Sequence, residues 1–251
     1  MNLMKLLKLR RYLPSAVVVL ALIGSFFIPN AVIGVMDARR LDNLIIIDAQ
    51  GIIPGAENEL SLLKRITLAA SSNTEVLPIT AGQVMEMETA RSRAVRELTR
   101  FFDDGPFEFV IDNCVVDDSA ASLIIDTEDP TVNMIIWEFK ILDLYANEVT
   151  ITIDDETGVI LKLIYRRENG SLYSEELPDE DMAGLYNDEL YDVAMRLSEM
   201  MDAYYGLPVM LSDYHFSGTM AYYMVEMNSG GQTIQMYGVV RSNNFSVNER
   251  L

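Results

Sequence analysis

Cysteine and histidine are nearly absent from this chain of 251 residues, and both shortages limit its chemistry. Cys114 is the only cysteine, so no intramolecular disulfide can form, and His215 is the only histidine. A zinc site of the ordinary type therefore lacks ligands. A serine or cysteine hydrolase would need His215 as its general base, but the sequence has no glycine-serine elbow, and Cys114 lies in an apolar run. We expect no catalytic residues, no metal ligands and no cofactor.

Basic residues are also scarce, because 19 Lys and Arg stand against 38 Asp and Glu, which gives a formal net charge of -19. Four of the basic residues precede the first apolar stretch, so the remainder has 15 Lys and Arg against 38 Asp and Glu, a net charge of -23. Binding to nucleic acid or to anionic lipid headgroups requires a basic surface. Nucleic acid is therefore excluded as a partner.

One long uncharged stretch, residues 14–36, contrasts with the charged remainder. At a helical rise of about 1.5 Å per residue it matches a hydrocarbon core of roughly 30 Å, which predicts a single transmembrane helix with the membrane as its partner. The basic tail, residues 1–13, favours a cytoplasmic N-terminus and an extracytoplasmic C-terminal domain. The alternative is a signal peptide cleaved near Gly34 or Ala38, which predicts a secreted protein.

Helical and strand-like patterns alternate after the apolar stretch. Residues 37–79 form a connecting segment that includes a short helix at 59–70 and extended chain at 76–79. Two further helices are predicted, one at 80–104 that starts with the capping-box pattern Thr80–Gln83, and one at 178–206. Period-two patterns predict strands at 107–111, 121–125, 134–142, 148–154, 159–166, 214–216, 219–227 and 233–241.

The order of these elements is a helix followed by strands, and it occurs twice. We therefore predict an α+β fold in which the N-terminal transmembrane helix is followed by two helix-on-antiparallel-sheet units, at 80–167 and 178–248.

The residues Ile136-Trp137-Glu138-Phe139, followed by the predicted hairpin at 149–161, resemble the end of a PepSY-type domain. In that family a strand with an aromatic or acidic pair precedes a hairpin with an acidic turn and a glycine. The resemblance implies a cystatin-like unit, in which a helix packs across an antiparallel sheet. Such units occur singly or as two tandem repeats. It also implies a membrane-anchored protein of Gram-positive bacteria that regulates sensor kinases or envelope peptidases, and it supplies no catalytic residues.

Arg93, Arg96 and Arg100 gather positive charge on one face of the predicted helix at 80–104. One interpretation is a solvated face that pairs with nearby acids. The other is a docking site for an acidic partner, and these three arginines are our candidate partner-facing residues. Two acidic clusters, at 154–158 and at 126–129, lack the ligand spacing of a calcium loop, so turn formation is the favoured interpretation and weak cation binding the alternative.

These observations together predict a non-enzymatic interaction or regulatory module of the bacterial envelope, with an unidentified protein partner. The alternatives are an envelope hydrolase whose site is not visible in one sequence and a weak cation-binding protein.

Overall fold

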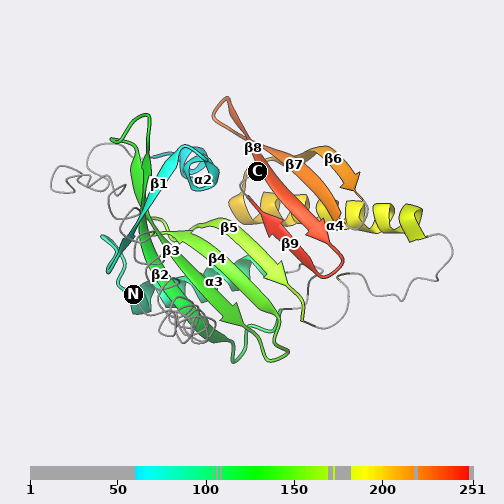
Figure 1. The fold of residues 1–251 in the computed structure, drawn as a ribbon, viewed down its shortest axis with the longest axis horizontal. Helices are drawn as coiled ribbons and strands as arrows, with labels where there is room; N and C mark the ends of the chain where they lie inside the picture. The colour runs from blue at the N-terminus through cyan, green and yellow to red at the C-terminus, as the bar shows by residue number, and fades with distance from the viewer. Residues whose placement is uncertain are drawn as a thin grey trace, which may run out of the picture. The chain divides into compact units, whose positions relative to one another are not determined.

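Nine antiparallel strands form a single sheet in the computed structural model, and three helices accompany it in the described residues (Figure 1). The structure describes residues 60–248 except 104, 106, 108, 169–171, 173–181 and 218–219, and for 182–186 it describes the backbone only. The strands are β1 (Thr74–Ile79), β2 (Val115–Asp126), β3 (Asn133–Leu142), β4 (Glu148–Asp154), β5 (Ile160–Arg166), β6 (Val209–Ser217), β7 (Met220–Ser229), β8 (Gln232–Arg241) and β9 (Asn244–Val247). The helices are α2 (Leu62–Ala70), α3 (Met87–Phe102) and α4 (Met182–Tyr205).

The strand order is β1-β2-β3-β4-β5-β9-β8-β7-β6, so β5 and β9 join two runs of sequential hairpins. Leu163 of β5 lies opposite Val247 of β9, and Tyr165 lies opposite Phe245. All four of these side chains are buried. The last strand of the chain therefore lies inside the sheet, where its apolar side chains complete the core.

Helices α3 and α4 pack on the sheet and against each other. Helix α3 contacts β3, β4 and β5, whereas α4 contacts β6, β7 and β8, and both ribbons pass behind the strands in Figure 1. Each helix buries an apolar stripe spaced three and four residues apart, as expected for an amphipathic helix. The stripes are Ala90, Ala94, Leu98 and Phe101 on α3, and Leu190, Ala194, Leu197 and Met201 on α4. The facing strands bury alternate residues, including Val149, Ile151 and Ile153.

The predicted fold class is wrong in its main feature. We expected two separate helix-on-sheet units, at 80–167 and 178–248, whereas strands from both regions pair through β5 and β9 into one sheet of nine strands. Period-two patterns indicate which face of a strand is buried, but they do not show which strand edges meet. The β5–β9 pairing joins segments far apart in the sequence, and β9 has only four residues, so no local pattern predicted it.

The start of α3 is also corrected. The helix begins at Met87 and not at Thr80, so the predicted capping box is wrong. The backbone N–H groups of residues 83–85 instead donate to the carboxylate of Asp155, at 2.7–3.1 Å. A long-range contact, invisible in the local pattern, therefore organises the segment before the helix.

The strand predicted at 107–111 is absent from the described residues of that segment. Phe107 and Phe109 are nevertheless buried, and their rings pack within 6.3 Å of the Tyr165 ring. The alternation of apolar and polar residues there reflects the burial of side chains in a loop and not the pairing of a strand.

No helix among the described residues is long and apolar enough to cross a membrane. The predicted transmembrane helix at 14–36, the basic tail at 1–13 and residues 37–59 of the connecting segment lie outside the described residues. The single-pass interpretation therefore stays a prediction.

Candidate functional site

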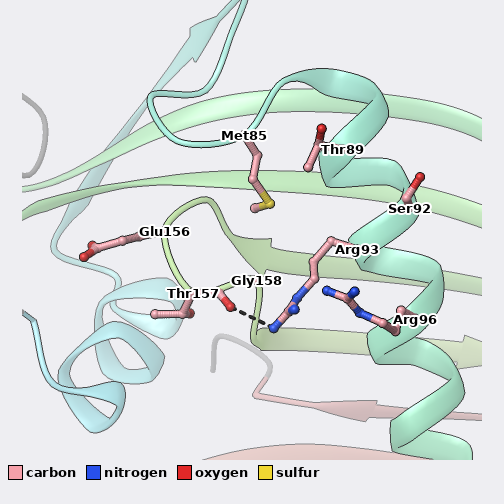
Figure 2. Close-up of a pocket in the computed structure, with 8 residues that line it drawn as sticks. All are labelled: Met85, Thr89, Ser92, Arg93, Arg96, Glu156, Thr157 and Gly158. Carbon is pink, nitrogen blue, oxygen red and sulfur yellow. Dashed lines mark hydrogen bonds between the residues drawn. The ribbon is translucent and has the colours of Figure 1, made fainter.

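A pocket of about 300 Å³ lies between the first half of α3 and the turn that joins β4 to β5 (Figure 2). It is lined by Met85, Thr89, Ser92, Arg93, Arg96, Glu156, Thr157 and Gly158. Figure 2 shows that Arg93 and Arg96 both extend from α3 toward Thr157 and Gly158. Ligand pockets range from about 300 to 1,000 Å³, so a pocket of this size suits one side chain or a small anion better than a large cofactor.

Gly158 allows the Arg93 side chain to lie against the turn. Its φ is +72°, a left-handed conformation that favours glycine, and a Cβ at this position would overlap the Arg93 side chain. The Arg93 Nη2 donates to the carbonyl oxygen of Thr157 at 3.0 Å. A glycine in the acidic turn therefore suits both the backbone conformation and the position of the arginine.

Asp155 lies in the turn between β4 and β5 and holds it in place. The residue is 2% exposed. Its carboxylate accepts hydrogen bonds from the backbone N–H groups of residues 83–85 and, at 2.7 Å, from the indole Nε1–H of Trp137. Trp137 is fully buried on β3. Four donors converge on one carboxylate, so this acid links the β4–β5 turn, the segment before α3 and the core of the sheet.

Asp154 and Arg65 form a buried ion pair beside it. The Arg65 Nη1 lies 2.8 Å from Asp154 Oδ1, with 5% and 1% of the two side chains exposed, and the Arg65 Nη2 pairs with Glu156. Burial opposes the charge of the guanidinium, but the carboxylates of Asp154 and Glu156 outweigh it and raise the pKa of Arg65. The second oxygen of Asp154 accepts the backbone N–H and the hydroxyl of Thr157, at 2.7 and 2.6 Å.

The acidic residues at 154–158 are thus occupied by donors from the protein itself. The second cluster behaves in the same way, because Asp126 Oδ1 accepts the N–H of Glu128 and Asp129 Oδ1 accepts the N–H of Thr131. In the described part of the chain, no group of three or more His, Cys, Asp or Glu side chains is placed to hold a metal ion. Both acidic clusters serve as turns in this structure.

Glu97 gives two of the three candidate arginines an internal role. Its side chain is 4% exposed, and its Oε1 lies 3.1 Å from Arg93 Nη2. Its Oε2 accepts the Tyr204 hydroxyl at 2.8 Å and lies 3.8 Å from Arg100 Nη1. Arg100 also donates to the Tyr204 carbonyl at 3.0 Å and stacks over the Tyr204 ring, 5.1 Å from its centroid. Arg93 and Arg100 therefore neutralise a buried carboxylate between α3 and α4.

Arg96 has a different environment from the other two arginines. Its side chain is exposed and lines the pocket, and it forms no ion pair or hydrogen bond with any residue that the structure describes. Nearby, the Arg93 Nε is buried without an acceptor among those residues. Glu156, the one acidic residue of the lining, pairs with Arg65 and points away from the arginines in Figure 2. The pocket therefore has unsatisfied donors and a positive charge, which match an acidic group.

Cys114 and His215 are not brought together as a nucleophile and its base. Cys114 directly precedes β2, and His215 is exposed on the edge strand β6, seven strands away in the sheet order. At about 4.8 Å per strand this separation is roughly 34 Å. Burial raises the pKa of the Cys114 thiol, which disfavours the reactive thiolate. These two residues therefore do not form a cysteine–histidine dyad.

Three tyrosine hydroxyls near α4 donate hydrogen bonds inside the protein. The donors and acceptors are Tyr204 to Glu97 Oε2, Tyr205 to the Ile160 carbonyl and Tyr214 to the Asn187 carbonyl, at 2.8–3.0 Å. Burial, with a smaller contribution from Asp188, raises the pKa of Tyr214 to about 12. Burial raises the pKa of Tyr204 and Tyr205 further.

We therefore predict that alkaline pH destabilises the fold. A tyrosine has a pKa of about 10 in an unfolded chain, so a raised folded-state pKa contributes stability below pH 10 that is lost as the pH rises toward 12. Urea unfolding at pH 8, 10 and 11.5 should show a falling midpoint, with a smaller fall in the Tyr214→Phe variant. Equal falls in both proteins would contradict the assignment to Tyr214.

Comparisons of the chain with protein-family models, with curated proteins and with solved structures find no match. They supply no family, so the resemblance of residues 136–161 to PepSY-type domains stays a prediction.

Proposed function

We propose that the chain is a non-enzymatic interaction module whose α3 pocket binds an acidic side chain of a protein partner. The observation that supports this most directly is Arg96, an exposed guanidinium that has no partner among the described residues and lines a pocket on a strongly acidic protein. A guanidinium presents donors in a planar fork that matches a carboxylate. The Arg93 side chain beside it adds a second guanidinium.

The acidic remainder of the protein gives this pocket its selectivity. A partner with an acidic segment is repelled by most of the surface and attracted at the α3 pocket, so it docks in one orientation. A surface ion pair alone contributes about 0.2–1 kcal/mol, so shelter in the pocket and contacts around it must provide the remaining affinity. The pocket wall is rigid because Asp155 and the Arg65–Asp154 pair hold the β4–β5 turn.

Reversing single arginines separates binding from folding. Arg96→Glu should change the free energy of unfolding by less than about 0.5 kcal/mol, because the side chain is exposed and pairs with none of the residues that the structure describes. Arg93→Glu should lower it by about 1–3 kcal/mol, because a second carboxylate then faces buried Glu97. Urea unfolding of the two variants measures the difference. Equal stabilities would contradict the internal role of Arg93.

Site-specific photo-crosslinking tests the partner directly. A photoreactive residue at Ser92, which lines the pocket and is exposed, should capture a protein at a segment rich in Asp and Glu. Adding Arg96→Glu should remove the crosslink. The control Lys64→Glu reverses the charge of an exposed residue on α2 and should leave the crosslink unchanged. A crosslink that survives Arg96→Glu would exclude the pocket as the binding site.

A further inference from the structure

A second surface lies at the turn between β3 and β4. Leu144 is 62% exposed and Tyr145 is 68% exposed. Val115, which begins β2 and is 59% exposed, lies opposite Leu142, two residues before Leu144. Three apolar side chains from two segments therefore project into solvent at one end of the sheet. We call Val115, Leu144 and Tyr145 the apolar tip.

The turn that carries the apolar tip is held by hydrogen bonds. Asp143 is 7% exposed, and its Oδ1 accepts the N–H groups of Tyr145 and Asn147, both at 2.8 Å. Its Oδ2 accepts the side-chain amide of Asn147 at 2.8 Å. The Oδ1 of Asn147 accepts the N–H of Glu168 at 3.2 Å, which ties the turn to the segment after β5. A turn ordered before binding loses little conformational entropy when its exposed side chains bind.

The charges around the apolar tip indicate what it binds. Asp112, Asp117 and Asp118 are exposed on the segment that leads into β2 and along its start. Lys140, a cation of the neighbouring β3, is paired with Glu148 at 2.9 Å. Arg166, an exposed cation of β5, lies opposite Glu148 in the sheet. The three exposed aspartates leave the surroundings of the tip acidic on balance, and the whole chain has a formal net charge of -19. An anionic lipid surface and a second copy of this chain are both repelled.

We infer that the apolar tip inserts into an apolar cleft with a basic rim on a protein partner. Tyrosine is among the side chains that contribute most of the binding energy at protein interfaces, so Tyr145 is the expected anchor. A basic rim complements the aspartates around the tip and orients the partner. Tyr145 provides a large ring at low entropic cost, and Leu144 and Val115 extend the apolar area beside it.

The apolar tip and the α3 pocket are separate surfaces. The pocket lies at the turn after β4, whereas the tip lies at the turn before β4. The seven residues of β4 rise by about 3.4 Å each, so the two turns are roughly 24 Å apart. The inference about the tip therefore does not depend on the proposed function of the pocket.

Photo-crosslinking from the full chain in its own cells tests the inference. The photoreactive amino acid p-benzoylphenylalanine replaces Tyr145, and in a control protein it replaces Met210, which is 58% exposed on β6. We expect a crosslink from position 145 to an apolar protein segment with Lys or Arg beside it. Adding Leu144→Ser should lower the yield at least tenfold without moving the urea midpoint, and adding Arg96→Glu should leave the yield unchanged.

The other outcomes would overturn the inference. Crosslinks to lipid, to a second copy of the chain or to an acidic segment each identify a different occupant. Equal yields from positions 145 and 210, or no crosslink from position 145, show that the tip is not a docking surface. An unchanged yield after Leu144→Ser shows that apolar contact does not hold the partner.

Discussion

Replacing Asp155 with alanine is expected to lower the free energy of unfolding by about 3–5 kcal/mol, among the largest effects of any single substitution in this chain. The carboxylate accepts the N–H groups of residues 83–85 and the indole N–H of Trp137. Trp137 is fully buried, so its donor would be left without a partner and without water. The measurement is urea unfolding followed by tryptophan fluorescence, which reports on this residue because it is the only tryptophan.

Two variants control for the loss of an acidic side chain. Asp118→Ala removes an exposed carboxylate of β2 that accepts one hydrogen bond, from the adjacent N–H of Ser119, and should leave the urea midpoint nearly unchanged. Asp155→Asn keeps one acceptor oxygen, but its NH2 group then faces N–H donors and cannot accept a hydrogen bond from them. The stability of this variant should therefore lie between those of the wild type and Asp155→Ala. An Asp155→Ala protein as stable as Asp118→Ala would contradict the central role given to this carboxylate.

Replacing Arg65 with methionine is expected to cost about 3–5 kcal/mol, because it leaves a buried carboxylate without its counter-charge. Asp154 has a side chain that is 1% exposed, whereas the other partner, Glu156, is 53% exposed and contributes little. Arg65 also donates from Nε to the Leu60 carbonyl at 2.9 Å, so the substitution loosens the start of α2 as well.

The double variant Arg65→Met, Asp154→Asn identifies the cause. A neutral amide at 154 leaves no unpaired charge, so the double variant should recover a substantial part of the stability lost in Arg65→Met. Chemical denaturation of the wild type and the two variants measures how much stability the double variant recovers. A double variant no more stable than Arg65→Met would show that the loss comes from packing and not from the buried charge.

The sequence predicted the elements better than their assembly. The bounds of β4 match the expected strand, and α2, β3, β5 and α4 lie within a few residues of their predicted positions. These segments have strong periodic patterns that depend only on local burial. Two contacts join segments that are distant in the sequence: the pairing of β5 with β9, and the hydrogen bonds from residues 83–85 to Asp155. No local sequence pattern predicts either contact.

The sequence showed the three arginines of α3 but not their different environments. The spacing of Arg93, Arg96 and Arg100 placed them together on α3, but it treated the three arginines as equivalent, and their role toward a partner stays a prediction. Glu97 lies four residues after Arg93 and three before Arg100, so the helical spacing of opposite charges was a signal for the internal pairs. Whether Arg93 and Arg100 pair internally depends on the burial of Glu97. That burial in turn depends on the packing of Tyr204 from α4.

Arginine side-chain resonances measure occupation of the α3 pocket most directly. Full-length protein labelled with ¹⁵N is titrated with a tetraglutamate peptide, and with tetraglutamine as the uncharged control, while the Nε–H signals of Arg93, Arg96 and Arg241 are followed. We expect saturable shifts at Arg96 and Arg93 with tetraglutamate alone, weakened by added salt, and no shift at Arg241, an exposed arginine of β8. Shifts of equal size at all three arginines, or none at Arg96, would contradict the proposal that this pocket binds acidic side chains.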